Sequence, residues 1–317
     1  MNAPLARSAV IALALWAGGQ PATAQDIARP RYRVDVNLVG LTFTVTDGKG
    51  HPIHGLRPED IRIAEDGIPQ KITAFAEGSD VRERAVPEVP QGTNVFILFD
   101  TSDHMYRSIP YVCDAIAAFL RRLNPPDAAA VYTFSRNLSR AAQLTHDRVL
   151  LRAALAQNVS AGDDTALFNC LLLTLRDAAR VPGRKAVVVF SNGPDNKSML
   201  SPDDVGAVAQ DEGIPVYVVS TLDPAKDRAT ASALDRLAAR TGGRLFLAPK
   251  WQAIAHAFTA IQEEIAASYT AFYYPAANPN QGFRRITVQV VSPNGKTYTI
   301  RTRAGYHAHK TGQAGTD

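Results

Sequence analysis

The sequence has little cysteine and no apolar run long enough to span a membrane. Only two cysteines, Cys113 and Cys170, occur in 317 residues. Two thiols exclude a small disulfide-stapled fold and a zinc or iron–sulfur site built from four cysteines. A transmembrane helix needs about 20 predominantly apolar residues, and no segment of the chain reaches that length. Most enzymes and most binding modules remain open.

An excess of one charge is also missing. The chain has 34 Lys and Arg against 30 Asp and Glu, a net charge of +4, and 46% of its residues are hydrophobic. This composition is typical of globular proteins and too apolar for disorder. Because the basic residues are scattered, we expect no nucleic-acid partner. At about 150 residues per domain, the length allows one large or two modest domains.

Common catalytic signatures are absent as well. The sequence has no Gly-x-Ser-x-Gly, His-Glu-x-x-His or Gly-x-Gly-x-x-Gly string, which disfavours hydrolase elbows, zincins and dinucleotide-binding enzymes. Gly295-Lys296-Thr297 matches the end of a phosphate loop, but Val290 stands where that loop requires glycine. A Ser102/His104 nucleophile pair is conceivable, although it has no orienting third group. We therefore expect no enzyme.

The first 24 residues have the pattern of a secretory signal peptide. Arg7 gives a positive start, Ala9–Trp16 is a short apolar stretch, and Ala22-Thr23-Ala24 is a small-x-small cleavage site. The alternative is an uncleaved membrane anchor, but the apolar run is too short to span a bilayer. We expect a periplasmic or extracellular protein with no stable membrane insertion after cleavage. In that compartment the two cysteines can form a disulfide or remain free, buried thiols.

The spacing of apolar residues divides the rest of the chain into three regions. From Tyr32 to about Phe75, and again from Tyr269, the side chains alternate with period 2, which predicts short antiparallel strands. Asn294-Gly295 predicts a hairpin turn between two of them. Between these regions, continuous apolar strands alternate with helices. That alternation predicts a doubly wound, mostly parallel sheet covered by helices on both faces.

Each predicted β region is too small to be stable alone. We therefore predict an α/β domain inserted in a split, antiparallel, β-sandwich-like subdomain; the alternative is two separate hairpin appendages. The predicted organisation is a signal peptide at 1–24, an N-terminal β segment at 30–78, a charged linker at 79–93, the α/β domain at 94–268, a C-terminal β segment at 269–308 and a tail at 309–317.

Three polar loops lie where an open parallel sheet binds ligands, beyond the carboxyl ends of its strands. Residues 100–104 (D-T-S-D-H) follow the first predicted strand of the α/β region, and residues 191–196 (S-N-G-P-D-N) follow a later one. Residues 162–165 (G-D-D-T) open a helix. Together the loops supply carboxylate, hydroxyl and amide oxygens. Such hard donors suit Mg²⁺, Ca²⁺ or Mn²⁺.

These loops resemble the metal-ion-dependent adhesion site of von Willebrand factor type A domains. That site combines D-x-S-x-S after the first strand, a Thr that opens a later helix and an Asp after the fourth strand. The flanking β segments, with T-D-G-K-G at 46–50 and R-A-G-Y-H at 303–307, resemble exported von Willebrand A-related proteins of the acidobacterial type. The resemblance covers residues 30–308 and implies a von Willebrand A, Rossmann-like fold.

The ligand set that the resemblance implies departs from the family pattern at two positions. Asp100, Ser102 and Thr165 match, whereas His104 replaces the second Ser and Asn192 replaces the Asp. Because affinity for a divalent ion depends on the number of charged ligands, the missing carboxylate weakens the site. Nearby acids that could compensate are Asp163, Asp164 and Asp195. The expected cofactor is one divalent cation, Mg²⁺, Mn²⁺ or Ca²⁺, or Zn²⁺ if His104 is a ligand; the site could also hold none.

The resemblance implies adhesion rather than catalysis, with an acidic side chain of a partner protein completing the coordination of the metal. We therefore expect an exported protein-interaction or adhesion module with a degenerate metal-ion-dependent adhesion site. One alternative is a metal-independent envelope scaffold that binds its partner at exposed strand edges. In that case the loops are polar caps, with Asp100 and Thr165 at helix N-termini. A hydrolase that uses the same crevice is the less favoured alternative.

Overall fold

The computed structural model describes residues 38–78, 80–84, 90–105, 108–157, 162, 164–291 and 297–308. The predicted signal peptide, the C-terminal tail and the Asn294-Gly295 turn lie outside the described residues. Within those ranges, every helix is too short or too polar to cross a membrane.

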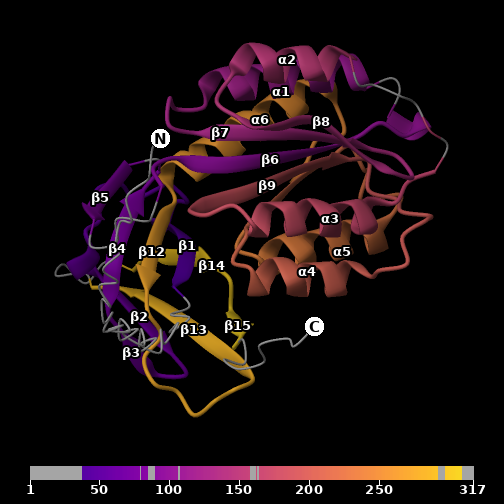
Figure 1. Cartoon of the computed structure of the whole chain (residues 1–317). Helices are drawn as coiled ribbons and strands as arrows, with labels where there is room; N and C mark the ends of the chain where they lie inside the picture. Colours follow the sequence, from indigo (N-terminus) through magenta and orange to yellow (C-terminus); the bar gives the residue numbers. More distant parts are fainter. Residues whose placement is uncertain are drawn as a thin grey trace, which may run out of the picture. The chain divides into compact units, whose positions relative to one another are not determined.

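A six-stranded sheet forms the centre of the α/β core (Figure 1). Its strand order is β11-β10-β9-β6-β7-β8, and only β8 runs antiparallel to its neighbour. The strands are β6 (Thr93–Asp100), β7 (Ala128–Phe134), β8 (Leu138–Thr145), β9 (Arg184–Ser191), β10 (Val216–Ser220) and β11 (Leu245–Leu247). The continuous apolar run of β6 reflects its central position.

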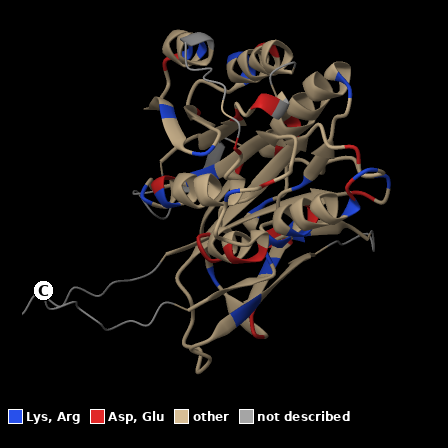
Figure 2. Ribbon diagram, turned by 90° about the vertical axis from the view of Figure 1, so that its right-hand side faces the viewer, with Lys and Arg blue, Asp and Glu red and all other residues tan. Residues whose placement is uncertain are grey.

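Helices cover both faces of this sheet, as Figure 1 shows. One face packs against α1 (Ile109–Arg122), α2 (Arg148–Gln157) and α6 (Trp251–Ala267); the other packs against α3 (Leu167–Ala179), α4 (Pro202–Asp211) and α5 (Arg228–Arg240). Along β6, Ile97 and Phe99 join the first hydrophobic core, whereas Phe96 and Leu98 join the second. This alternation confirms the predicted doubly wound arrangement. Figure 2 shows basic and acidic residues interspersed on the helices and loops.

Two antiparallel sheets are built from the segments before and after the core. The five-stranded sheet has the order β14-β1-β12-β4-β5, and the four-stranded sheet has the order β15-β13-β2-β3. The strands are β1 (Val39–Thr46), β2 (Ile61–Glu65), β3 (Ile68–Gln70), β4 (Ile72–Glu77), β5 (Asp80–Arg84), β12 (Tyr269–Tyr273), β13 (Phe283–Val290), β14 (Thr299–Thr302) and β15 (Gly305–His307). Because β1 pairs with β12 and β14, and β2 with β13, the chain on the two sides of the core forms one subdomain. The predicted fold class is confirmed.

Two edge strands differ from the sequence prediction. The segment 79–93 was predicted to be a linker, but β5 pairs with β4 over part of it and β6 begins at Thr93. The sequence analysis also assigned no element to β8, which forms one edge of the six-stranded core sheet beside β7. Both strands carry charged residues, which edge strands tolerate because one side has no neighbouring strand.

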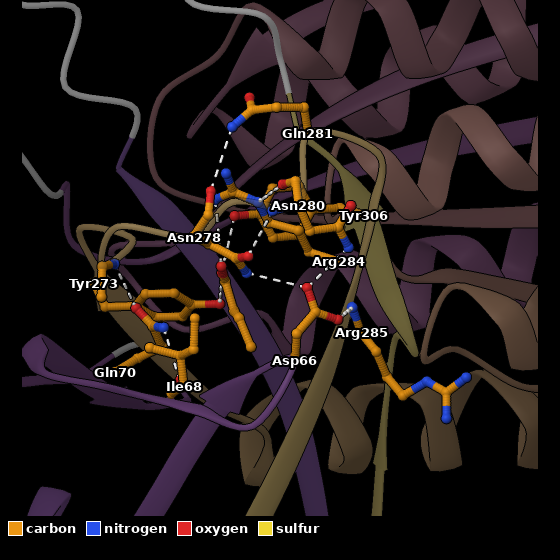
Figure 3. A network of polar contacts seen from close by, with 12 residues as sticks. Asp66, Ile68, Gln70, Tyr273, Asn278, Asn280, Gln281, Arg284, Arg285 and Tyr306 are labelled. Atoms are coloured by element: carbon orange, nitrogen blue, oxygen red, sulfur yellow. Dashed lines mark hydrogen bonds and ion pairs between the residues drawn. The ribbon is translucent and has the colours of Figure 1, made fainter.

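A buried carboxylate, Glu65, joins strands of the two β sheets; its partners Tyr273, Tyr306 and Arg284 are labelled in Figure 3. Its Oε1 accepts hydrogen bonds of 2.8 Å from the hydroxyls of Tyr273 and Tyr306, and Arg284 Nη1 lies 3.6 Å from its Oε2. Burial and the Glu65 charge raise the pKa of Tyr273, and burial and the hydrogen bond to Glu65 raise that of Tyr306 to about 12. Both hydroxyls therefore keep their protons and donate. A buried charge needs such partners, so the network holds distant segments in register.

We predict that Tyr273→Phe lowers the free energy of unfolding by about 1–3 kcal/mol, because a buried carboxylate loses a hydrogen-bond donor. Urea titration measures this change. Tyr274→Phe is the matched control: Tyr274 is the exposed neighbour, and its substitution should change the same quantity by less than about 0.5 kcal/mol. Equal effects of the two substitutions would contradict the role given to Glu65.

Candidate functional site at the carboxyl edge of the core sheet

The strand order of the core sheet reverses between β6 and β9. The chain leaves β6 toward β7 on one side and later continues through β9 and β10 on the other. Phe99 of β6 lies opposite Phe190 of β9, so Asp100 and Ser191 end neighbouring strands at the same edge. In open α/β sheets this is the place where ligands bind.

Asp100 ties together the loops that follow these two strands. The carboxylate is fully buried; its Oδ1 accepts a hydrogen bond from Ser102 N at 2.9 Å, and its Oδ2 accepts one from Ser191 Oγ at 2.6 Å. Ser191 Oγ in turn accepts a hydrogen bond from Gly193 N at 3.1 Å. Gly193 has a φ of 102°, a conformation that favours glycine. The carboxylate therefore determines the path of both loops.

Two oxygens in the loops after β6 and β9 lack partners among the described residues. Ser102 Oγ and Asn192 Oδ1 are buried, and neither has a hydrogen-bond partner among the described residues. An unsatisfied buried polar group costs about 1–3 kcal/mol. Such atoms therefore indicate a place where an external group completes the bonding. Serine and asparagine oxygens next to a carboxylate are donors that a hard divalent cation accepts, so the donor set fits such an ion.

The third predicted loop, which contains Thr165, meets the other two. Ser102 forms a parallel bridge with Gly162, whose carbonyl accepts a hydrogen bond of 2.9 Å from Asp103 N. Thr165 is buried, and its N donates to Asn196 Oδ1 at 3.0 Å in the loop after β9. Asp100, Ser102, Thr165 and Asn192 thus lie on three loops that are hydrogen-bonded to one another.

The carboxylates of Asp195 and Asp164 have other partners. Asp195 Oδ2 accepts from Phe168 N at 3.0 Å in the first turn of α3, and its Oδ1 accepts from Lys197 N and Ser198 N at 3.1 and 2.8 Å. Asp164 lies 3.4 Å from Lys197 Nζ and 3.7 Å from an Arg136 nitrogen. Asp195 therefore stabilises α3 and its own loop. Asp164 forms ion pairs with Lys197 and Arg136.

The other predicted site residues are only partly described. His104 lies in a short 3-10 helix, Asp103–Met105, and its side chain falls outside the described part of the structure, as does the whole of Asp163. In the part that is described, no three His, Cys, Asp or Glu side chains form a group that could hold a metal ion. The described donors are therefore neutral oxygens around the single carboxylate of Asp100.

In the described residues, the N-cap positions of α1 and α3 are Ser108 and Ala166, rather than Asp100 and Thr165. Asp100 binds Ser102 N and Ser191 Oγ, and the residue before α1, Ser108, makes no capping side-chain bond. The first turn of α3 is capped by Asp195, whose partner Phe168 lies 27 positions earlier in the chain. Local capping patterns extend over about three residues, so the sequence contained no signal for this contact.

The two cysteines remain apart. Cys113 packs with the core on the α1 side of the sheet and Cys170 with the core on the α3 side, and both are free. The sheet between them excludes a disulfide within the chain. Burial, followed by the charges of Asp195 and Asp100, raises the pKa of Cys170 to about 12. This thiol therefore stays protonated and is a poor nucleophile.

Comparison with known proteins identifies the core. The model of the von Willebrand factor type A domain matches residues 94–260. No curated protein sequence matches the chain.

Several solved structures are similar to part of the chain. An aerotolerance-related membrane protein from Bacteroides fragilis NCTC 9343 is 18% identical, covers 55% of this chain and 98% of its own, and has a TM-score of 0.44. BatB from Bacteroides thetaiotaomicron is 16% identical, with 54% and 100% covered and a TM-score of 0.44. The vWF domain of the type V pili tip protein Mfa5 from Porphyromonas gingivalis is 12% identical, with 57% and 96% covered and a TM-score of 0.47. The family assignment rests on the sequence match alone.

We predict that Asp195→Ala lowers the free energy of unfolding by about 1–2 kcal/mol, the usual cost of removing a helix-capping side chain. Asp164→Ala is the matched control. Its ion pairs are long and partly exposed, so the change should stay within about 0.5 kcal/mol. Thermal or urea unfolding compares the two variants. A larger loss in Asp164→Ala than in Asp195→Ala would overturn this assignment of roles.

Proposed function

Because the chain belongs to the von Willebrand factor type A domain family, we propose that it is an exported protein-binding module rather than an enzyme. Domains of this family generally mediate protein–protein interactions. The proposed binding surface is the carboxyl edge of the core sheet around Asp100, Ser102, Thr165 and Asn192. Export is inferred from the signal-peptide pattern of residues 1–24, which places the mature protein in the periplasm or outside the cell.

The observation that carries this proposal is the pair of unsatisfied buried oxygens, Ser102 Oγ and Asn192 Oδ1. They belong to the loops that the Asp100 carboxylate holds in place through Ser102 N and Ser191 Oγ. A loop that served only as a connection would satisfy these atoms within the fold. Their lack of donors among the described residues supports a site that is completed from outside the chain.

A divalent cation is the group that these donors suit best. The hydroxyls of Ser102 and Thr165, the amide oxygen of Asn192 and the carboxylate of Asp100 would hold it. When bound, such a cation supplies a positive charge that can accept a carboxylate from an acidic side chain of a partner protein. Since only Asp100 among these four carries a charge, we expect weak affinity, with a Kd of about 0.1–1 mM, as in weak extracellular calcium sites.

The same shortage of charge favours the second candidate, a metal-independent scaffold. In this case the Asp100 network only shapes a rigid polar surface, and partner binding persists after chelation with EDTA and in Asp100→Asn. The metal-dependent module loses partner binding under both conditions. The two candidates therefore differ in a single binding assay.

For the metal-dependent module, we predict that calorimetry detects binding of Mg²⁺, Mn²⁺ or Ca²⁺ to the wild type and a Kd at least about tenfold higher in Asp100→Asn, because the only charged ligand is lost. This substitution keeps the shape of the side chain. Asp235→Asn, on the exposed face of α5, removes the same charge away from the site and should bind like the wild type. An absence of heat with these cations and with Zn²⁺, or unchanged binding in Asp100→Asn, would contradict the proposed metal site.

We also predict that Asn192→Asp tightens divalent-ion binding by about tenfold or more, because it restores a second negative charge to the ligand set. In EDTA this variant should melt at a lower temperature than the wild type, since two close carboxylates repel each other. Excess metal should reverse that loss.

The control for this prediction is Gln289→Glu, which adds one negative charge at an exposed position of β13 in the β subdomain, away from the carboxyl edge of the core sheet. It should leave metal affinity unchanged. A melting temperature of Asn192→Asp that is the same with and without metal would contradict a ligand role for position 192.

A further inference from the structure

A second candidate site lies at the opposite end of the core sheet. A groove of about 460 Å³ lies between the turn that precedes β9 and one face of the five-stranded β sheet. The β-sheet side is formed by alternate residues of β1 and β12, namely Gly40, Thr42, Thr270 and Phe272. Its volume is within the range of small-molecule sites, about 300–1,000 Å³.

This groove is distinct from the proposed partner-binding edge. Arg184, which lines the groove, is the first residue of β9, whereas Ser191 is the last. At about 3.3 Å per residue, the strand separates the two places by about 23 Å. A ligand in the groove therefore makes no direct contact with Asp100 or Asn192.

Positive charge predominates along the groove. Its lining includes Arg180, Arg184 and Lys185, against the single acid Glu212. Arg180 and Glu212 are exposed and Lys185 is half-buried, so these three are accessible from solvent. Arg184 is the buried member of the group, with 4% of its surface exposed. The groove thus combines two accessible cations with one that is almost fully desolvated.

The hydrogen bonding of Arg184 is incomplete. Its Nε donates to Thr270 Oγ1 at 2.9 Å and its Nη2 to Ser268 Oγ at 2.8 Å. Its Nη1 is buried and has no hydrogen-bond partner among the described residues. No carboxylate in the described ranges forms an ion pair with it. A water molecule can accept one hydrogen bond here, but it adds no negative charge beside the guanidinium.

Burial lowers the pKa values of two of these cations, Arg184 and Lys185. Burial lowers the pKa of Arg184 to about 10, although the charge of Asp127 opposes the shift. Burial also lowers the pKa of Lys185, whose Nζ donates to Gly183 O at 3.0 Å. An anion placed between the two groups would stabilise both charged forms. At neutral pH Arg184 stays protonated and available as a donor.

Apolar side chains complete the lining. Leu38, Val181, Pro182 and Phe272 contribute carbon surface beside the cations. A bare inorganic anion would leave this surface exposed to water. A ligand that carries an apolar group next to its charge would bury it and gain from the hydrophobic effect.

We infer that this groove binds an organic oxyanion, a carboxylate or phosphate group attached to a small apolar body. Lys185 Nζ donates to the oxygens of the anion, because charge-assisted hydrogen bonds of this kind are strong where water is partly excluded, and the buried charge of Arg184 attracts the anion from the wall of the groove. The apolar body lies against Phe272 and Val181. Arg180 at the rim attracts the anion.

The inference is tested with three small aromatic probes that share one ring: benzoate, phenyl phosphate and neutral benzamide. We expect benzoate or phenyl phosphate, or both, to bind the full-length protein and to shift the amide resonances of Arg184 and Thr270 in NMR titrations. Benzamide should bind at least about tenfold more weakly, because it lacks the charge. Comparison of the two anions distinguishes a carboxylate site from a phosphate site.

Charge reversal localises the binding. The double substitution Arg180→Glu/Lys185→Glu should raise the Kd of the bound anion by at least about tenfold. Arg228→Glu/Arg236→Glu, on the exposed face of α5, changes the net charge equally and should bind like the wild type. The titrations are run in EDTA, so that the result is independent of any divalent-ion site.

The inference is overturned if neither anion binds the wild type at millimolar concentration, if benzamide binds as well as the anions, or if both double variants bind alike. Folding of each variant is checked by its amide spectrum. If the rim double variant does not fold, Arg180→Glu alone replaces it, with Arg236→Glu as its control and the same expected direction.

Discussion

One buried carboxylate organises the carboxyl edge of the core. Asp100 accepts hydrogen bonds from Ser102 N and Ser191 Oγ, so the loops after β6 and β9 are shaped by the same group. A charge with no exposed surface must be matched by donors, and the donors come from both strands' loops. Each loop also carries an oxygen, on Ser102 or Asn192, that finds no donor in the part of the chain that the structure describes. The arrangement that satisfies Asp100 thus leaves unsatisfied oxygens beside it.

The spacing of apolar residues predicted the layers of the fold, because that spacing depends on which faces of each strand are buried. Strand β6 is covered on both faces and is apolar from Val95 to Phe99, while β2 alternates between buried and more exposed residues. Edge strands β5 and β8 were missed because they follow neither pattern. The apolar residues of β8 neither alternate nor form a continuous run, β5 has a single apolar residue, and each strand is placed by its neighbour, β7 or β4. No local signal indicates that distant segments pair, as β2 does with β13. That pairing was predicted because each β region is too small to be stable alone.

The sequence predicted the position of the candidate site because it predicted where the core strands end. Asp100, Thr165 and Asn192 follow strands or open a helix, and parallel strands end at the same edge. Asp195 caps α3, and Arg184 donates hydrogen bonds to Ser268 and Thr270. Because these contacts join residues far apart in the chain, only the folded structure reveals them. The same contacts define two ends of one sheet with different chemistry. One end presents neutral oxygens around a carboxylate, and the other presents cations beside apolar surface.

The central claim is that the Asp100 edge holds a divalent cation that a partner's carboxylate can bind. The most direct measurement is elemental analysis after equilibrium dialysis, in which the mature protein, purified without chelator, stays in contact with several millimolar Mg²⁺ or Mn²⁺ and the metal content of the dialysate is subtracted. The account predicts about one Mn²⁺ or Mg²⁺ per chain in the wild type and a markedly smaller amount in Asp100→Asn. Equal metal content in the two proteins, or none in either, would contradict it.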